Sequence, residues 1–563
     1  MDKERIDLHV HSNRSDGTLS PAELVDYALQ KGLKAIALTD HDTVDGLDEI
    51  MAYAKDKPLE VIPGIEYSTE YHKRDVHIVG LFIDYKAPVF TEYLERFQQS
   101  RVNRNYKLCA NLQRAGMDIT YEALLEAFPD SVITRAHYAA FLLEKGYVNS
   151  RNEAFDRYLG DHTPYFVHRE KITPQEVIAV TKKAGGIPIL AHPTLYKLGR
   201  EQLEQLVSTL KDVGLMGIET MYSTYNSAEE RRIKELAKKY YLLESGGSDF
   251  HGENKPGLEL GTGYGKLAVG AELLENMKKA LTTKILFTDL DGTLLSDAKK
   301  DISAVTRDKI LEMLGAGHHF VLASGRSLNS ILGVLEELNI LEALAKLQKK
   351  QQTGGVYAAA FNGAQLYDCI AKKPIAQYMV SIPTAQWLFD MAAARGMYIQ
   401  TYMDKKLVSI ADGKELEFYK KLIPMEHEIT QRLENVLDHA PFKLLAIDLE
   451  DRARLEAFRE TVQAAEESSN IICAFSNPMY LEFYDKRAGK GNALVNLCNA
   501  LHVLEKNAIA AGDEENDCSM IEAAGIGVAM ANAVPLLKER ADYITEKDNN
   551  HDGIVEVIER FIL

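Results

Sequence analysis

The chain has 563 residues, of which 46% are hydrophobic and 26% are charged, and its formal net charge is -18. This balance is typical of folded globular domains and excludes a disordered tail or a collagen-like repeat. The negative charge disfavours a large nucleic-acid surface and attraction to an anionic membrane. At roughly 150 residues per domain, the length predicts about four folding units.

The first residues, MDKERIDLHVHS, are charged and then polar, so they lack the apolar core of a signal peptide. No apolar run approaches the ~18 residues that cross a bilayer. The five cysteines lie far apart without CxxC spacing, which argues against a disulfide scaffold and against a cysteine zinc site. We therefore expect a soluble, cytoplasmic protein that does not bind membranes, and the sequence leaves its oligomeric state open.

Apolar, β-branched runs alternate with helical patterns between residues 5 and 251, which predicts parallel β/α units. Metal-binding residues follow six of these runs, mostly at the C-terminal end, where active sites of β/α barrels form. His9 and His11 are two apart, so both point to one side of a strand and can share an ion. Burying such groups together is costly unless metal ions join them. The candidate ligands are His9, His11, Asp16, His41, Glu66, His77, His192, Asp249 and His251.

This half of the chain resembles the PHP (polymerase and histidinol phosphatase) superfamily in the motifs DLHVHSNRSDGTLSP, LTDHDTVDG, PGIEY, VHIVGL, AHP and GGSDFHG. The resemblance implies a distorted seven-stranded barrel with two or three divalent metals (manganese, iron or zinc). It implies that one ion is bound by His9, His11, Glu66 and Asp249, with Glu66 bridging, and that Asp16, His41, His77, His192 and His251 complete the other sites. Asp40 and Asp42 are candidates for orienting His41, with turn or cap chemistry as the alternative.

Clustered divalent ions generate hydroxide near neutral pH, so we interpret the site as one that hydrolyses phosphate esters without a protein nucleophile. A helix-patterned insertion from about residue 85 to 171 resembles that of nucleoside 3',5'-bisphosphate phosphatases and RNase AM-type 5'-to-3' exonucleases. That branch implies that Arg135 and His137 contact substrate phosphate, which suits the fork of a guanidinium. The alternatives are a surface salt bridge for Arg135, a helix-face role for His137, and a histidinol-phosphatase-like enzyme, which the insertion makes a poorer match.

The second half begins with an apolar strand that ends in two aspartates and a glycine, KILFTDLDGTLLS, after a boundary near Thr283. Further strand-end signals are FVLASGRS with Ser324, LEFYDKRAGKG with Lys490, and IAAGDEENDCSM with Asp513, Asn516 and Asp517. The carboxyl ends of parallel strands are where open α/β sheets bind ligands. This set, together with FNGAQL and GVAMANA, resembles the Cof-type phosphatases of the haloacid dehalogenase (HAD) superfamily.

The HAD resemblance implies a magnesium ion held by Asp289, the backbone carbonyl of Asp291 and Asp513, with Asp517 in support. Asp289 would attack phosphorus, and Asp291 would protonate the leaving group and then deprotonate the hydrolytic water. Lys490 and Ser324 would stabilise the transferring phosphoryl group. Asn516 is a further candidate for contacting phosphate, and Glu482 is interpreted as a structural charge on a strand.

Only a turn, one helix and one strand fit between Asp289 and Ser324, so no early cap fits there. The longer segment between Gly363 and Lys490 shows α/β patterns, and the resemblance makes it a C2-type cap with Trp387 in its core. We therefore predict an α/β chain with a PHP barrel in residues 1–283, a Rossmann-like HAD core in residues 284–365 and 475–563, and the cap in residues 366–474.

The predicted function is that of a bifunctional metal-dependent phosphohydrolase, whose partners are small phosphorylated molecules or short oligonucleotides. The PHP head would act on nucleoside 3',5'-bisphosphates or 5'-phosphorylated oligonucleotides, and the HAD head on a sugar phosphate or nucleotide. In the alternative, only one head is catalytic and the other is a metal-binding regulatory or ligand-sensing module.

Overall fold

The computed structural model describes residues 4–129, 131–160, 162–167, 172–349, 353–403, 406–422 and 425–563. The chain forms two compact units, Met1–Leu281 and Thr282–Leu563. Among the helices that the structure describes, none is long and apolar enough to cross a bilayer.

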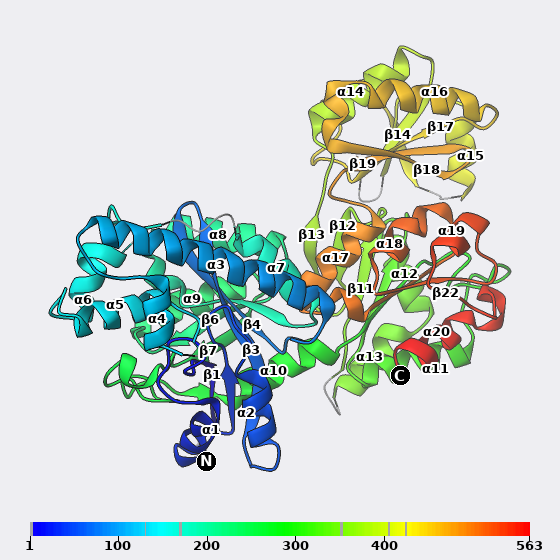
Figure 1. The fold of residues 1–563 in the computed structure, drawn as a ribbon. Helices are drawn as coiled ribbons and strands as arrows, with labels where there is room; N and C mark the ends of the chain where they lie inside the picture. The colour runs from blue at the N-terminus through cyan, green and yellow to red at the C-terminus, as the bar shows by residue number, and fades with distance from the viewer. Residues whose placement is uncertain are drawn as a thin grey trace. The chain divides into compact units, whose positions relative to one another are not determined.

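The first unit is built on an eight-stranded sheet that curls into a nearly closed barrel (Figure 1). Its strand order is β7-β6-β5-β4-β3-β2-β1-β8. The sheet closes between the segment after β7 and β1, because Asp249 N–H donates to the His9 carbonyl (2.9 Å) and His11 N–H donates to the Phe250 carbonyl (3.0 Å). The barrel expected from the sequence is thereby confirmed, but it has eight strands and not seven, because the two-residue strand β8 pairs with β1. Its strands are β1 (Arg5–Val10), β2 (Ala35–Leu38), β3 (Glu60–Tyr71), β4 (Arg74–Leu81), β5 (Ile187–Leu190), β6 (Gly217–Tyr222), β7 (Leu243–Gly247) and β8 (Val269–Gly270).

The barrel departs from the predicted parallel β/α repeat at β4, which runs antiparallel to both β3 and β5. A two-residue turn joins β3 to β4, and both its residues, His72 and Lys73, have positive φ (49° and 63°). Such a turn matches the twist of the flanking strands and forces a hairpin. The expectation of parallel pairing was therefore wrong at this position, and the hairpin is the main distortion of the barrel.

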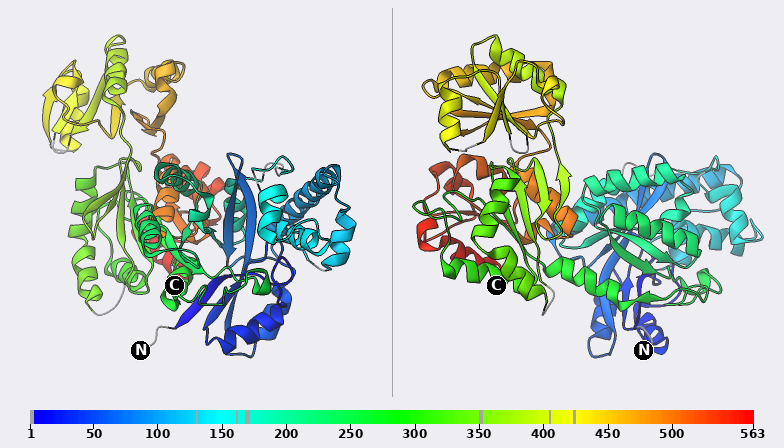
Figure 2. Two further views of the ribbon diagram at one scale, coloured as in Figure 1. Left: turned by 90° about the vertical axis from the view of Figure 1, so that its left-hand side faces the viewer. Right: turned by 180° about the vertical axis from the view of Figure 1, so that it is seen from behind.

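Helices cover the barrel, and a separate group of them forms the insertion (Figure 2). The insertion has its own apolar core, which includes Leu112, Leu124 and Tyr138. The end of the predicted insertion, residues 168–171, lies outside the described residues. The barrel helices are α1 (Pro21–Gln30), α2 (Leu47–Ala54), α7 (Pro174–Lys183), α8 (Arg200–Asp212), α9 (Ser227–Lys239) and α10 (Ala271–Thr282). Those of the insertion are α3 (Pro88–Arg114), α4 (Tyr121–Ala127), α5 (Arg135–Glu144), α6 (Arg151–Ala154) and the π-helical turn η1 (Phe155–Leu159).

The second unit has a Rossmann-like core sheet in the order β13-β12-β11-β10-β9-β20-β21-β22. All of its strand pairs from β11 to β22 are parallel, whereas β12 and β13 add an antiparallel edge. The strands are β9 (Ile285–Thr288), β10 (His319–Ala323), β11 (Val356–Ala360), β12 (Gln365–Asp368), β13 (Lys373–Gln377), β20 (Ala508–Gly512), β21 (Ile526–Ala529) and β22 (Tyr543–Ile544). The helices are α11 (Ala304–Gly315), α12 (Leu328–Glu337), α13 (Ile340–Gln348), α17 (Lys490–Leu501), α18 (Cys518–Ala523), α19 (Pro535–Arg540) and α20 (Gly553–Phe561).

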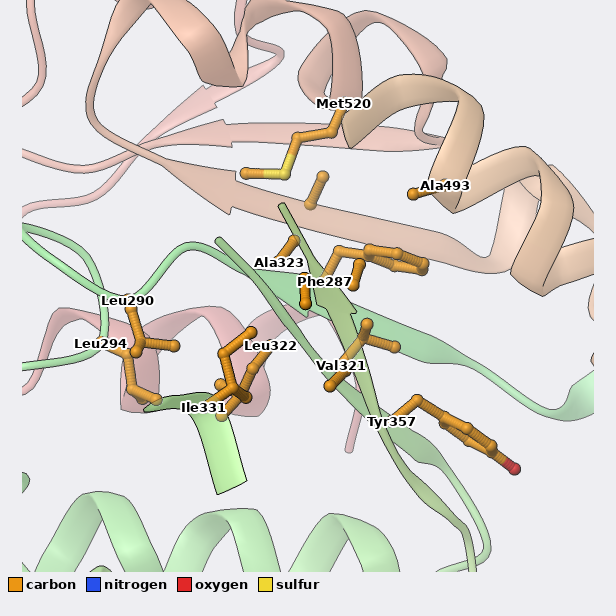
Figure 3. Packing of buried hydrophobic residues seen from close by; sticks show 14 of the residues in the cluster. Phe287, Leu290, Leu294, Val321, Leu322, Ala323, Ile331, Tyr357, Ala493 and Met520 are labelled. Carbon is orange, nitrogen blue, oxygen red and sulfur yellow. The ribbon is translucent and has the colours of Figure 1, made fainter. Parts of the chain in front are cut away.

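The central strands of this sheet are buried on both faces, which explains their continuous apolar sequences. Phe287 of β9 lies toward Ala493 and Met520, whereas Leu322 of β10 lies with Ile331 on the other side (Figure 3). This packing positions the carboxyl ends of β9 and β10, where the loops that carry Asp289 and Ser324 begin.

The cap is a six-stranded sheet in the order β16-β15-β14-β17-β19-β18, with α14 and α16 on one face (Figure 1). The predicted cap limits, residues 366 and 474, need correction, because β12 and β13 pair with the core sheet while β18 and β19 pair with the cap sheet. The cap strands are β14 (Tyr398–Met403), β15 (Lys406–Ser409), β16 (Glu426–Ile429), β17 (Lys443–Ile447), β18 (Ile471–Asn477) and β19 (Tyr480–Asp485). Its helices are α14 (Ile382–Ala393), α15 (Lys414–Leu422) and α16 (Arg452–Gln463).

Truncating a cap-core side chain should destabilise the second unit. Phe458 is 1% exposed, and Phe458→Ala should lower the free energy of unfolding by about 3–5 kcal/mol through lost burial and a cavity. The single tryptophan, Trp387, packs against the same cluster, so its fluorescence during urea denaturation reports the change. Ile429→Ala, at a cap position that is 46% exposed, is the control and should change stability by no more than about 0.5 kcal/mol.

Candidate functional sites

The nine residues that are predicted from the sequence to be metal ligands come together at one end of the barrel. His9 lies in β1 and His11 directly follows it, Glu66 lies in β3 and His77 in β4. The others lie in the loops that follow β1, β2, β5 and β7: Asp16, His41, His192, Asp249 and His251. Strands that are distant in sequence thus place their polar side chains at the same end of the barrel, as in other β/α barrels.

Glu66, which is 1% exposed, lies at the centre of this cluster with five imidazoles around its carboxylate. Oε2 is 3.2 Å from Nε2 of His9 and of His11 and 3.1 Å from Nδ1 of His41, while Oε1 is 2.7 Å from Nδ1 of His77 and 2.9 Å from Nε2 of His192. Burial by itself would raise the pKa of Glu66, but the imidazoles of His41 and His9 hold it well below its usual range. Glu66 is therefore an ionised carboxylate that several ions could share.

Two further carboxylates flank this centre. Asp249 Oδ1 is 3.3 Å from His11 Nε2, and Asp16 Oδ1 is 3.2 Å from His251 Nε2. Ligand atoms within 4.8 Å of one another define three groups in the barrel. They are His9, His11, Glu66 and Asp249; His11, Asp16, His41 and His251; and His41, Glu66 and His77.

The donor atoms of these groups fit divalent metal ions. Asp16 Oδ1 and His41 Nδ1 are buried and, despite these short approaches, form no hydrogen bond with any residue that the structure describes. Burial lowers the pKa of His41 to about 3, which favours the neutral imidazole that metals bind. Imidazole nitrogen combined with carboxylate oxygen suits zinc, iron or manganese.

Glu219 of β6 is a functional residue that the sequence reasoning missed. Its Oε1 lies 2.8 Å from His9 Nδ1, and its Oε2 accepts the backbone N–H of His192 (2.6 Å). It is 1% exposed and so fixes the orientation of two candidate ligands. The sequence did hold a signal for this residue, because a glutamate inside the apolar run LMGIET indicates a buried charge that needs a partner. Tyr222, which donates to Asp249 Oδ2 (2.6 Å), follows in the same strand.

The two aspartates proposed to orient His41 have other partners. Asp40 accepts hydrogen bonds from Ser12 and Ser15, in the loop after β1. Asp42 binds the Arg101 guanidinium of the insertion. Asp40 therefore shapes the ligand loop, and Asp42 ties the insertion to the barrel.

A cavity of about 340 Å³ opens beside the ligand cluster and is bounded by the insertion. Asp16, His41, His77 and His251 reach its wall, and so do the cations Arg101, Arg104, Arg135, Arg151 and Lys255. Arg135 is paired with Asp75 and its guanidinium lies 5.4 Å from the Phe166 ring. His137 is not part of this wall: its Nδ1 accepts the Thr134 N–H (3.1 Å), and burial lowers its pKa to about 4.

The second site lies at the carboxyl ends of β9, β10 and β20, which are adjacent and parallel. Lys490 Nζ donates to Asp289 Oδ1 (2.6 Å) and to Asp517 Oδ1 (2.5 Å). Burial raises the pKa of Asp289 to about 6 and that of Asp513 to about 7. Asp289, Asp513 and Asp517 form a group that could hold a metal ion, and a cation there would offset the crowding of negative charge. The hard carboxylate oxygens suit magnesium.

The remaining predicted residues border this group. Ser324 is 4% exposed, and its Oγ accepts the Arg326 N–H (3.2 Å). Asp291 is held by Arg326, whose Nε and one terminal nitrogen lie 2.9 and 2.7 Å from its two oxygens. Asn516 lies on the wall of a neighbouring cavity. Arg326 belongs to the SGRS motif, but nothing in the sequence paired it with Asp291.

Glu482, interpreted from the sequence as a structural strand charge, is 3% exposed and faces the catalytic core. It binds Lys443 Nζ (2.9 Å) and the side-chain amide of Asn362 (2.5 Å). Lys443 also donates to the Gly325 carbonyl (3.1 Å), in the loop after β10. This buried pair ties the cap sheet to the core sheet.

Glu219→Gln tests the role of Glu219 as an orienting residue. The amide can still accept the His192 N–H, but the anionic partner of His9 is lost. The affinity of the barrel for manganese or zinc should fall by about 10- to 100-fold, as measured by competition with a chelator. Glu244→Gln, in β7, where the carboxylate accepts from Thr220 (2.9 Å), is the control. Equal affinities for the wild type and Glu219→Gln would contradict this role.

Comparison with known proteins assigns the two units. A PHP-domain family model matches residues 7–185, and a haloacid dehalogenase-like hydrolase model matches residues 286–558. A 5'-3' exoribonuclease of Haemophilus influenzae is 38% identical over 248 residues, which are 44% of this chain and 90% of that protein. A 3',5'-nucleoside bisphosphate phosphatase of Chromobacterium violaceum is 32% identical over 257 residues, 46% of this chain and 90% of that protein.

The second half has its own relatives. The 5-amino-6-(5-phospho-D-ribitylamino)uracil phosphatase YwtE of Bacillus subtilis is 27% identical over 303 residues, which are 50% of this chain and 98% of that protein. The chain therefore joins a PHP domain and a haloacid dehalogenase-like hydrolase domain in one polypeptide, and through its N-terminal half it belongs to the PHP family.

Proposed function

We propose that the chain is a bifunctional phosphohydrolase with one working site in each unit. The observation that carries the proposal is the presence of two complete donor sets, one of imidazoles and carboxylates and one of carboxylates with a lysine. The first suits manganese, iron or zinc, and the second suits magnesium. A module that only senses a ligand would not need Asp289 and Lys490 in contact at a buried strand end.

For the barrel site we propose substrates of the nucleoside 3',5'-bisphosphate or 5'-phosphorylated short oligonucleotide class. The support is the cation-lined cavity beside the ligand cluster, together with the names of the two barrel relatives. Bound divalent ions would supply an activated water and neutralise phosphoryl charge. Arg135 would pair with substrate phosphate through its fork, and the buried wall would limit access of bulk water. His137 would act by holding the start of α5, which carries Arg135.

For the HAD site we propose a small phosphomonoester, such as a sugar phosphate or a nucleotide. Asp289 attacks phosphorus, and the alcohol oxygen leaves with a proton from Asp291. Lys490 and Ser324 stabilise the charge on the transferring oxygens. Asp291 then takes a proton from the water that cleaves the aspartyl-phosphate, so that Asp289 is regenerated and inorganic phosphate is released. To do this, the Asp291 carboxylate leaves its ion pair with Arg326.

Glu66→Gln tests the barrel site in the full-length chain. Loss of the central carboxylate should lower hydrolysis of adenosine 3',5'-bisphosphate and of a 5'-phosphorylated trinucleotide by at least about 100-fold with manganese. Release of phosphate is the measurement. Turnover of sugar phosphates with magnesium, at the other site, serves as the internal control. Unchanged hydrolysis of both nucleotide substrates would refute this assignment.

Asp289→Asn tests the HAD site in the same panel. Removing the nucleophile should lower magnesium-dependent turnover of p-nitrophenyl phosphate and of sugar phosphates by about 1,000-fold or more. Turnover of adenosine 3',5'-bisphosphate with manganese is the control. If one of the two variants abolished every activity, the chain would have a single working site.

A further inference from the structure

The cap carries a set of groups that the phosphoryl chemistry does not use. A cavity of about 380 Å³ is lined by Lys490 and Asn516 of the core and by several residues of the cap. The cap residues on its wall include Arg452 and Arg459 of α16 and Phe475 of β18. Because the lysine that contacts Asp289 lines the same cavity as the cap arginines, one substrate molecule could reach both.

The two arginines are held in place by an aromatic ring. They are seven residues apart on α16, so they lie on one face of the helix. The guanidinium carbon of Arg452 is 4.2 Å from the centre of the Phe475 ring, and that of Arg459 is 5.1 Å away. Cation–π contact of this kind orients the planar groups, and their terminal nitrogens can still bind an anion.

The charge of Arg459 is not compensated within the part of the chain that the structure describes. Its Nε is buried without a hydrogen-bond partner, and no ion pair joins it to another described residue. Glu482 on the cavity wall is paired with Lys443, Arg540 with Glu522, and Lys490 with Asp289, whereas the carboxylate of Glu515 on the same wall is exposed to solvent. Arg452 is bonded to Glu456 (2.8 Å) and is half-exposed at the rim. The Arg459 side chain is only half-buried, but a guanidinium on a cavity wall with a buried, unpartnered nitrogen favours an anion beside it.

We infer that Arg459, with Arg452 at the rim, binds a second anionic group of the HAD substrate, a carboxylate or a phosphate, at the end remote from the transferring phosphoryl group. This inference rests on the proposed phosphatase activity of Asp289. It narrows the substrate class to phosphorylated sugar acids and sugar bisphosphates, because a sugar monophosphate would offer Arg459 no anionic partner. Charge-assisted pairing with a guanidinium fork gives both affinity and orientation.

The test compares substrates that differ only in the second anion. The panel is glucose 6-phosphate, 6-phosphogluconate and glucose 1,6-bisphosphate, with p-nitrophenyl phosphate as the generic phosphatase substrate, all assayed on full-length protein with magnesium. For the wild type, kcat/KM should be higher for one or both doubly anionic substrates than for glucose 6-phosphate. In Arg459→Gln the ratio of doubly to singly anionic kcat/KM should fall by roughly 10- to 100-fold, as expected for one lost charge-assisted pair.

The control is Arg454→Gln, in the same helix, where the guanidinium binds Asp448 (2.8 Å) and not the cavity. Its ratio should equal that of the wild type. Arg459→Lys keeps the charge without the fork and should retain part of the preference, and Trp387 fluorescence verifies that each variant is folded. The 6-phosphogluconate and bisphosphate arms distinguish a carboxylate from a phosphate.

A ratio that is unchanged in Arg459→Gln would overturn the inference while leaving the phosphatase assignment intact, provided that p-nitrophenyl phosphate is still hydrolysed in an Asp289-dependent way. A wild type that prefers glucose 6-phosphate over both doubly anionic substrates would overturn it as well. Failure of the wild type to hydrolyse any member of the panel would overturn the phosphatase proposal, and the inference with it.

Discussion

The barrel unit depends on one buried carboxylate, that of Glu66, with the imidazoles of five histidines around it. Taking a carboxylate out of water is costly, and this cost is offset only by close partners that donate hydrogen bonds or carry positive charge. Those partners come from β1, β4 and the loops after β2 and β5, so the cluster can form only when the barrel is closed. The backbone hydrogen bonds that close the barrel involve His9, His11 and Asp249 themselves. The same residues therefore close the barrel through their backbone and form the candidate metal site through their side chains.

In the HAD unit the proportions are reversed, because several carboxylates surround one buried cation. Three aspartates crowd the carboxyl edge of a parallel sheet, where burial raises the pKa values of Asp289 and Asp513. A single buried lysine, Lys490, lies between two of them and lowers the cost of their negative charge. The same cation can then stabilise phosphoryl oxygens. In a chain of net charge -18, each candidate site thus places cationic side chains next to its carboxylates.

The cap is connected to this edge by polar contacts that are unusually well buried. Lys443 and Glu482 form an ion pair that also reaches the Gly325 carbonyl and the Asn362 amide. Buried pairs of this kind contribute little net stability, but they penalise any arrangement that leaves one partner unpaired. The pair therefore favours one register of cap against core, and this register also sets which cap residues border the cavity above Lys490.

The sequence by itself determined the kinds of ligand and their places at strand ends, because residue type and two-residue spacing are local properties. His9 with His11, and Asp289 with Asp291, could be identified in this way. Only the tertiary structure decided which side chain contacts each of these residues. Glu219 meets His9 and Arg326 meets Asp291 through contacts that span 210 and 35 residues, and no local pattern encodes such pairings. The β3–β4 hairpin and the limits of the cap were likewise settled by strand pairing, since an apolar run does not reveal its neighbour or its direction.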